Sequence, residues 1–277
     1  MKQVNPSPFH FVRQTGQKRR ASTDLLQTMN IQDRQREKWL FVSPHDDDLA
    51  IGGALWMQAA VAAGIDVEVL IVTDGRMGYC TLAQRANIVK IRRAETYTSF
   101  AILGIPRAKV SYLGYPDGGL YPYQGRRKAQ RGEPGIKGYT GLSNAFTYHL
   151  RRVRPTRVLV PTPLDLHPDH QVTHNELMIS LFHASGQIWP ELGQPIDPIQ
   201  AVYEMAIYCD FSAPPNLGLR TNDAVFQTKL RSIAAYQSQL QIEQVVAQVR
   251  AAGAYEFLRE VDFKFYSASR YVDMFKV

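Results

Sequence analysis

The sequence lacks the long apolar runs and the cysteine frameworks that mark membrane-spanning and disulfide-rich secreted proteins. No apolar stretch approaches the roughly 20 residues that a membrane-spanning helix needs, and residues 1–6 contain no apolar core of a signal peptide. Only two cysteines occur among 277 residues, Cys80 and Cys209, with neither metal-binding nor disulfide spacing. The default prediction is a soluble, cytoplasmic protein with reduced thiols.

Lysine and arginine outnumber aspartate and glutamate, which gives the chain a formal net charge of +7. Much of the excess lies in two short stretches, one near the N-terminus and one in a later loop (Arg13, Lys18, Arg19, Arg20; Arg126, Arg127, Lys128, Arg131). A local charge run is typical of a solvated face, and no recognisable nucleic-acid-binding motif accompanies it. A nucleic-acid partner is therefore not favoured, an acidic substrate at the loop stays open, and so does a homo-oligomer.

The order of predicted elements is that of one α/β domain, residues 39–277, preceded by a polar N-terminal arm, residues 1–38, with a short helix around 23–29. Within the domain, apolar β-favouring segments alternate with helical patterns, with strands at 39–43, 66–73, 109–113, 157–161 and 201–209 and helices at 50–63, 82–103, 144–153, 171–184, 226–239 and 243–258. This alternation predicts a mostly parallel sheet with helices on both faces. Residues 114–141, rich in Gly and Pro, are predicted to be a long functional loop.

Two short clusters of His and Asp each follow a predicted strand: Pro44-His45-Asp46-Asp47-Asp48 and His167-Pro168-Asp169-His170. Because ligands bind at the carboxyl ends of parallel strands, the two clusters could converge although they are far apart in sequence. Imidazole and carboxylate without thiolate are typical of a catalytic divalent metal rather than a structural zinc site. The sequence therefore predicts a metal-dependent hydrolase.

His45 and Asp48 are three residues apart and would share a face if a helix begins there. With His170 they would make three protein ligands and leave a fourth position for water, whose pKa the metal lowers. Asp47 is the candidate general base that takes the proton of that water. The metal itself stays open among Zn, Fe(II), Co and Mn.

His167 is predicted to face the substrate as a protonated group that stabilises an oxyanion or donates to a leaving amine, and Asp169 to orient a histidine from behind its ring. Simpler readings exist: three aspartates can cap a helix N-terminus, and the second cluster can be a surface loop. His174, four residues after His170, is discounted as a ligand because Gln171 stands where the zincin pattern needs Glu.

The clusters also form part of an ordered set of motifs spanning residues 39 to about 240. The others are Gly52-Gly53, Thr73-Asp74-Gly75, Arg92-Arg93-Ala94-Glu95, Leu103-Gly104, Leu113-Gly114-Tyr115-Pro116-Asp117-Gly118 and Lys229 with Tyr236-x-Ser238-Gln239. In this order, the motifs resemble those of the LmbE-like/PIG-L family of metal-dependent N-deacetylases. The resemblance implies a Rossmann-like fold and removal of the acetyl group from an N-acetylglucosamine-type sugar or glycoconjugate, with zinc as the expected metal.

The same resemblance implies zinc binding by His45, Asp48 and His170, base catalysis by Asp47 and assistance of the tetrahedral intermediate by His167. It further implies sugar contacts by Arg92 and Asp117. Without it, those two would be interpreted as a helix-surface arginine and a turn former.

Four positions depart from the family pattern: Asp46 replaces Pro, Leu49 replaces Glu, Tyr236 replaces a common His, and Asp165 stands where some members carry Tyr. None of these changes removes a predicted ligand or the predicted base. Two alternatives remain: a hydrolase of another amide on a secondary-metabolite or nucleoside-linked sugar, and a non-catalytic protein that binds a glycan or nucleic acid.

Overall fold

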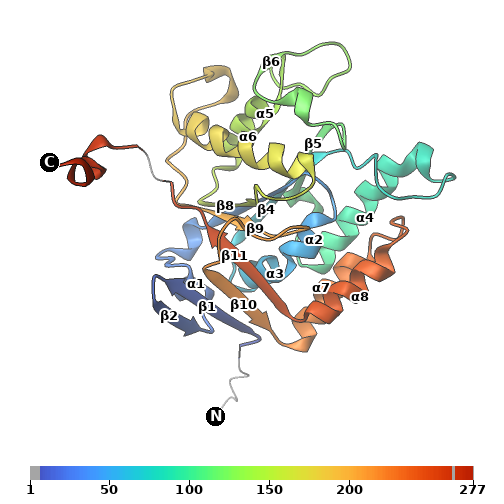
Figure 1. The fold of residues 1–277 in the computed structure, drawn as a ribbon. Helices are drawn as coiled ribbons and strands as arrows, with labels where there is room; N and C mark the ends of the chain where they lie inside the picture. The colour runs from blue at the N-terminus through green and yellow to red at the C-terminus, as the bar shows by residue number, and fades with distance from the viewer. Residues whose placement is uncertain (1–6, 264–265, 277) are drawn as a thin grey trace.

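The computed structural model describes residues 7–263 and 266–276. Its centre is a sheet in the order β2-β1-β10-β11-β9-β8-β3-β4-β5 (Figure 1). In chain order the strands are β1 Phe9–Thr15, β2 Lys18–Ser22, β3 Lys38–Ser43, β4 Asp66–Thr73, β5 Val110–Tyr115, β8 Arg157–Pro161, β9 Ala201–Met205, β10 Leu217–Thr221 and β11 Tyr255–Glu260. The run β9-β8-β3-β4-β5 is parallel, and the other neighbours pair antiparallel.

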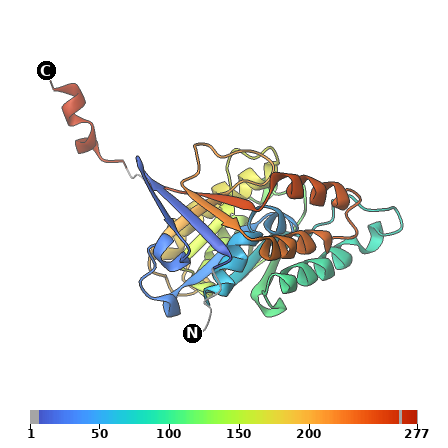
Figure 2. The same ribbon diagram turned by 90° about the horizontal axis from the view of Figure 1, so that it is seen from below.

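Helices cover both faces of the parallel half of the sheet (Figure 2). The helices are α1 Leu25–Thr28, α2 Asp48–Gly52, α3 Ala54–Ala62, α4 Ile88–Ile102, α5 Leu142–Val153, α6 Pro168–Ser185, α7 Asp223–Ala234 and α8 Ile242–Ala252. Short 3-10 turns lie at Arg34–Arg36, Arg85–Asn87, Arg107–Lys109, Tyr121–Tyr123, Pro190–Leu192, Ala268–Arg270 and Val272–Phe275. Among the residues described, no helix combines the length and apolarity needed to cross a membrane.

Successive side chains of β3 point to opposite faces of the sheet and pack into two separate cores. Trp39 and Phe41 pack into the core that includes α3, whereas Leu40 and Val42 pack into the core that includes α5 and α6. All four side chains are at most 1% exposed. A strand buried on both faces has a continuous apolar sequence, which is the pattern expected of a parallel strand covered by helices. The predicted α/β class is confirmed.

Register places the two His/Asp clusters beside each other. β3 and β8 are parallel neighbours, with Phe41 opposite Leu159, so the loops that follow the two strands leave the same edge of the sheet.

The helix predicted at 50–63 is two helices, α2 and α3, with Gly53 between them. The α3 N-terminus is satisfied separately: the Glu256 carboxylate accepts hydrogen bonds from the backbone of Leu55 and Trp56.

Part of the predicted N-terminal arm belongs to the sheet. Residues 9–22 form β1 and β2, and Phe9 and Phe11 bury their rings in the core while His10 between them is exposed. This alternation is the period of a half-buried strand. The short helix predicted around 23–29 is confirmed as α1.

The C-terminal half of the fold contains two strands that the sequence prediction missed. The helix predicted over 243–258 is wrong at its end, because α8 stops at Ala252 and Gly253 follows with φ of 89°. From Tyr255 the chain is β11, with Glu256 and Leu258 buried and the intervening residues exposed. β10 was not predicted at all, and α7 ends before the predicted residue 239.

The long loop predicted at 114–141 contains a small hairpin, β6 Arg127–Lys128 paired with β7 Tyr139–Thr140. The loop returns to the domain at Gly141, which has φ of 106°. A Cβ atom there would lie 2.2 Å from the Gly125 carbonyl oxygen, so only glycine allows this close approach of two backbone segments.

Candidate metal centre

Three ligand atoms converge at the carboxyl ends of β3 and β8. His45 Nδ1 lies 3.3 Å from Asp48 Oδ2 and 3.2 Å from His170 Nε2, and His170 Nε2 lies 3.2 Å from Asp48 Oδ2. A tetrahedral site with bonds of about 2.0–2.1 Å has ligand–ligand edges of roughly 3.3–3.4 Å. The three sides of this triangle fit a metal ion of that size, and all three residues are buried.

Local structure explains why these atoms meet. Asp48 is the first residue of α2, and its Oδ2 accepts hydrogen bonds from the His45 backbone N–H at 3.0 Å and from the Ser43 hydroxyl at 2.8 Å. His170 lies in the first turn of α6, which begins at Pro168. Asp48 Oδ1 is buried without a hydrogen-bond partner in the described part of the chain, so the carboxylate has unused capacity for a cation.

Electrostatics at the triangle are dominated by the Asp48 carboxylate. Burial opposes protonation of both histidines, yet Asp48 and the carboxylates behind the rings raise the pKa of His45 well above its usual value and that of His170 to about 9. Burial also opposes ionisation of Asp48, but His170 and His45 together hold its pKa well below the usual value. The pocket therefore stabilises positive charge beside Asp48, which a bound cation would supply in place of protons.

A second group of ligand-capable atoms, on His45, His167 and Asp169, lies beside the first. Its members are already engaged: His167 Nδ1 accepts the Asp169 backbone N–H at 3.2 Å. The Asp169 carboxylate accepts the backbone N–H groups of Gly118 at 2.8 Å and Leu120 at 3.1 Å. The first triangle is therefore the better metal site.

Asp169 lies where a residue that orients a histidine is expected, since its Oδ2 is 3.5 Å from His45 Nε2. Its shorter contacts hold the loop after β5. That loop carries Asp117, whose Oδ1 is 3.2 Å from His45 Nε2. In this structure Asp117 thus faces a metal-ligand candidate, and its role as a sugar contact stays a prediction.

His167 is half-buried, and its ring packs edge-on against His45 with 4.4 Å between ring centroids. Burial, followed by the neighbouring His45 charge, lowers the pKa of His167. The chain as described thus disfavours the protonated form that was predicted for this residue.

Asp47 is held by a buried network that the sequence prediction only partly anticipated. Its Oδ2 accepts hydrogen bonds from Arg92 at 3.1 Å and from Gln239 Nε2 at 3.2 Å. Arg92, only 3% exposed, also forms a bidentate pair with Asp46 and donates to Gln239 at 2.8 Å. The interpretation of Arg92 as a helix-surface arginine is wrong, and its predicted sugar contact remains untested beside these protein contacts.

The simpler readings of the clusters find little support. Asp47 is the N-cap of α2 but its side chain makes no capping hydrogen bond. His174, discounted as a ligand, faces Glu204 at 3.3 Å and lies outside the triangle.

Two site residues were missed, Gln239 and Asp165, although both were noted as parts of family motifs or departures from them. Asp165 is fully buried and its Oδ2 lies 3.2 Å from His170 Nδ1. Its position two residues before the second cluster was the available signal.

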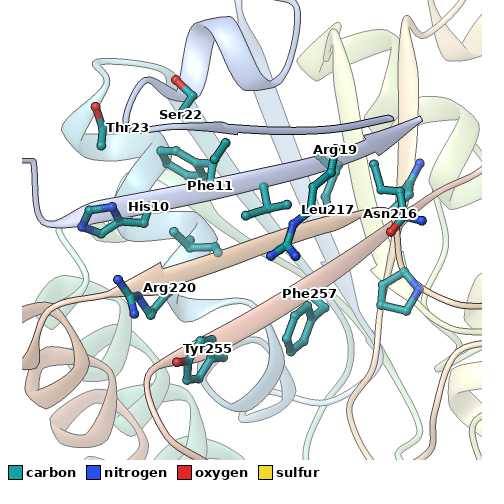
Figure 3. A pocket seen from close by; sticks show the side chains of 16 residues that line it. His10, Phe11, Arg19, Ser22, Thr23, Asn216, Leu217, Arg220, Tyr255 and Phe257 are labelled. Carbon is teal, nitrogen blue, oxygen red and sulfur yellow. The ribbon is translucent and has the colours of Figure 1, made fainter. Parts of the chain in front are cut away.

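A cavity of about 850 Å³ lies elsewhere, on the exposed face of β1, β10 and β11 (Figure 3). The labelled side chains of Tyr255, Phe257, Arg220 and His10 line it. Among the described residues that line it, none carries a carboxylate and none belongs to the triangle, so this hollow is not the site of the predicted chemistry.

Comparison with known proteins agrees with the fold. The chain is 28% identical over 211 residues to diacetylchitobiose deacetylase of Thermococcus kodakarensis, covering 73% of this chain and 70% of the relative. It is 28% identical over 183 residues to mycothiol S-conjugate amidase of Streptomyces coelicolor, covering 58% of each protein.

The crystal structure of N,N'-diacetylchitobiose deacetylase from Pyrococcus horikoshii has the same fold, with a TM-score of 0.68 at 23% identity over 91% of this chain and 95% of that one. The profile of the PIG-L family, described as GlcNAc-PI de-N-acetylase, matches residues 40–180, just over half of the chain and including both clusters. The chain therefore belongs to the PIG-L family.

Proposed function

We propose that this protein is a metal-dependent hydrolase that removes the N-acetyl group from an N-acetylglucosamine-type sugar or glycoconjugate, with zinc as its metal. The observation that carries the proposal is the triangle of His45, Asp48 and His170, whose edges of 3.2–3.3 Å suit a tetrahedral metal with one open position. Membership of the family and the similarity to a diacetylchitobiose deacetylase support an acetylated amino sugar as substrate.

When bound at the triangle, the metal would polarise the amide carbonyl and lower the pKa of a water molecule. Asp47 is the group that takes a proton from the attacking water. Within the described residues, both of its side-chain hydrogen bonds, from Arg92 and Gln239, reach Oδ2 and hold the carboxylate in place. Oδ1 is left to accept the proton, in the role of a general base.

His167 is the candidate for stabilising the oxyanion that forms when the water attacks the amide. Its Nδ1 accepts a backbone N–H, so the neutral ring carries its proton on Nε2. A ring N–H can donate a hydrogen bond to the developing oxyanion without the ring being positively charged. The departing sugar amine then collects the proton that Asp47 took from the water, and acetate is released.

A second amide substrate is favoured by one comparison, and one surface feature is compatible with it. The similarity to a mycothiol S-conjugate amidase supports hydrolysis of an amide with a different acyl group or aglycone. Loops at this end of the sheet carry exposed apolar side chains, among them Met77, Leu166 and Tyr208. Such a rim suits either a sugar face or an apolar aglycone.

The test pairs metal analysis with a free-amine assay on diacetylchitobiose and a panel of N-acetylglucosamine derivatives. We expect about one zinc per chain and amine release in the unmodified protein. Asp47→Asn should retain the metal and lose activity by at least roughly 100-fold, because general base catalysis contributes about that much or more. Asp33→Asn, at an exposed N-cap remote from the site, is the control.

Each failure would be informative. Loss of metal in Asp47→Asn would make Asp47 a ligand and not the base. Metal binding with release of amine only from other amides would support the second substrate class. An unmodified protein that binds no metal, even after reconstitution, would refute the proposed site.

A further inference from the structure

Each histidine of the triangle has a carboxylate facing its other ring nitrogen. His170 Nε2 points to the triangle, and Asp165 Oδ2 lies 3.2 Å from His170 Nδ1. His45 Nδ1 points to the triangle, and Asp117 Oδ1 lies 3.2 Å from His45 Nε2. The two rings therefore direct opposite nitrogens toward the triangle. A carboxylate oxygen lies 3.2 Å from each remaining nitrogen, close enough to accept its proton, although neither contact has the alignment of a formed hydrogen bond in the described chain. Asp169 Oδ2, at 3.5 Å, is the second carboxylate near His45 Nε2.

Asp165 is rigidly held for this contact. Its Oδ1 accepts the backbone N–H of His167 at 3.1 Å, and its Oδ2 also accepts the backbone N–H of Tyr208 at 3.2 Å. These donors come from the loops after β8 and β9, and the Asp165 side chain is fully buried. The carboxylate cannot rotate away from His170 without breaking both backbone contacts.

Asp117 is held in a similar way, with one carboxylate oxygen bound to the backbone and the other facing a histidine. Oδ2 accepts the backbone N–H of Met77 at 3.0 Å, which leaves Oδ1 directed at His45. The loop that carries Asp117 is itself fastened by Asp169 through the backbone of Gly118 and Leu120. Asp117 is thus held by the loop after β4 directly and by the start of α6 through its own loop.

We propose that Asp165 and Asp117 are positioning residues that fix the tautomer and orientation of the two metal-binding histidines. Asp165 keeps the His170 proton on Nδ1, so that Nε2 is free for the metal. Asp117 keeps the His45 proton on Nε2, so that Nδ1 is free for the metal. The inference rests on the proposed metal site, and it gives Asp117 a role other than contact with the sugar.

The physical basis is general. A histidine ligand whose other ring N–H donates to a carboxylate is held in one tautomer and is a stronger base toward the metal. Without that partner, the ring has two tautomers and can turn about its Cβ–Cγ bond. Loss of such a partner weakens metal affinity by about 10–100-fold.

The experiment measures zinc affinity of the full chain by competition with a chromophoric chelator, for the unmodified protein and for Asp165→Asn and Asp117→Asn. In each variant an amide of nearly the same shape replaces the carboxylate. In Asp165→Asn the amide oxygen can keep only one of the two backbone N–H contacts, so the tautomer readout below is needed beside the affinity. We expect each variant to bind zinc roughly 10–100-fold more weakly. Asp74→Asn is the matched control, since Asp74 supports the Asp117 backbone at 3.4 Å but contacts neither histidine.

Imidazole ¹⁵N spectra of the zinc-loaded proteins give a second readout that a general loss of stability would not change. The unmodified protein should show His170 protonated at Nδ1 and His45 protonated at Nε2. Zinc binding by the unmodified protein, combined with unchanged affinity and tautomers in both variants, would overturn this inference alone. An equal loss of affinity in Asp74→Asn would also overturn it, by showing a structural effect of the loop. Absence of zinc binding in the unmodified protein would instead refute the proposed function.

Discussion

His149 lies in α5 with 8% of its surface exposed, and its Nδ1 has no hydrogen-bond partner within the ranges 7–263 and 266–276. Burial first, and the nearby Arg152 charge second, lower its pKa to about 4. The folded chain thus keeps this ring neutral at a pH where the unfolded chain, with an ordinary histidine pKa of about 6.5, already binds a proton. Stability should fall as pH decreases from about 6.5 to about 4, by on the order of 3 kcal/mol from this residue.

His149→Gln should remove that part of the pH dependence. The measurement is the free energy of unfolding in urea at about pH 7 and about pH 4.5, for the unmodified chain and the variant. The difference between the two pH values should be smaller in His149→Gln than in the unmodified chain. The exposed His10 provides the control as His10→Gln, which should leave the difference unchanged. Equal pH dependence in all three proteins would contradict the assignment to His149.

At the scale of single residues, the sequence predicted which side chains meet when those side chains lie within one short motif. His45 and Asp48 are joined by the turn that starts α2, so their convergence follows from local spacing. Asp165 precedes the second cluster in the same loop, so its closeness to His170 in the sequence was the available signal. Gln239 reaches the site from the turn after α7, and its partners depend on how the chain is packed in three dimensions. Arg92 illustrates the same limit, because only tertiary packing shows that its guanidinium faces buried aspartates.

Among the elements, β1 tests whether the N-terminal residues are part of the folding unit. Phe11 is 1% exposed, packs against Trp56 of α3 with 5.8 Å between ring centroids, and lies on a strand paired with β10. Phe11→Ala should lower the free energy of unfolding by about 3–5 kcal/mol, the usual cost of removing a buried phenyl ring. His10→Ala, on the opposite face of the same strand, should change it by no more than about 0.5 kcal/mol.

Chemical denaturation followed by fluorescence and by circular dichroism would measure both variants. A single transition, shifted by Phe11→Ala, is expected because β1 shares the core of α3. If Phe11→Ala left the free energy of unfolding unchanged, residues 9–22 would instead be an appendage to the domain, as the polar composition of the arm suggested.

The elements that the sequence predicted well are those of the parallel half. β4 and β8 match the predicted ranges because strands buried on both faces are short, apolar and bounded by turn residues. β10 and β11 were missed because neither has the apolar run of a strand buried on both faces: β10 contains Gly218 and Arg220, and β11 buries Glu256 while it exposes Tyr255 and Phe257. The alternation in β11 follows directly on the helical pattern of α8, so the only local boundary is Gly253.

For the whole molecule, the proposed metal joins two parts of the chain that are distant in sequence. His45 follows β3 and His170 begins α6, and the metal would connect the two strand ends as one unit. A ligand that binds the folded state alone stabilises it by about 2.7 kcal/mol at 100 times its Kd. In a protein of this size, roughly 2–4 °C of melting temperature correspond to each kcal/mol. Zinc at that excess should therefore raise the melting temperature of the metal-free protein by about 5–10 °C.

The decisive comparison is between two buried histidines of the same helix. His170→Ala removes a corner of the triangle and should abolish the rise in melting temperature with zinc. His174→Ala, which instead loses a contact with Glu204, should be less stable overall but keep the full zinc-dependent rise. Differential scanning calorimetry across a zinc titration, before and after chelation, measures both effects in the intact chain. Loss of the zinc response in His174→Ala as well, or its persistence in His170→Ala, would place the metal somewhere other than the triangle. The specific dependence on His170 is expected because only that ring faces both His45 and Asp48 among the described histidines.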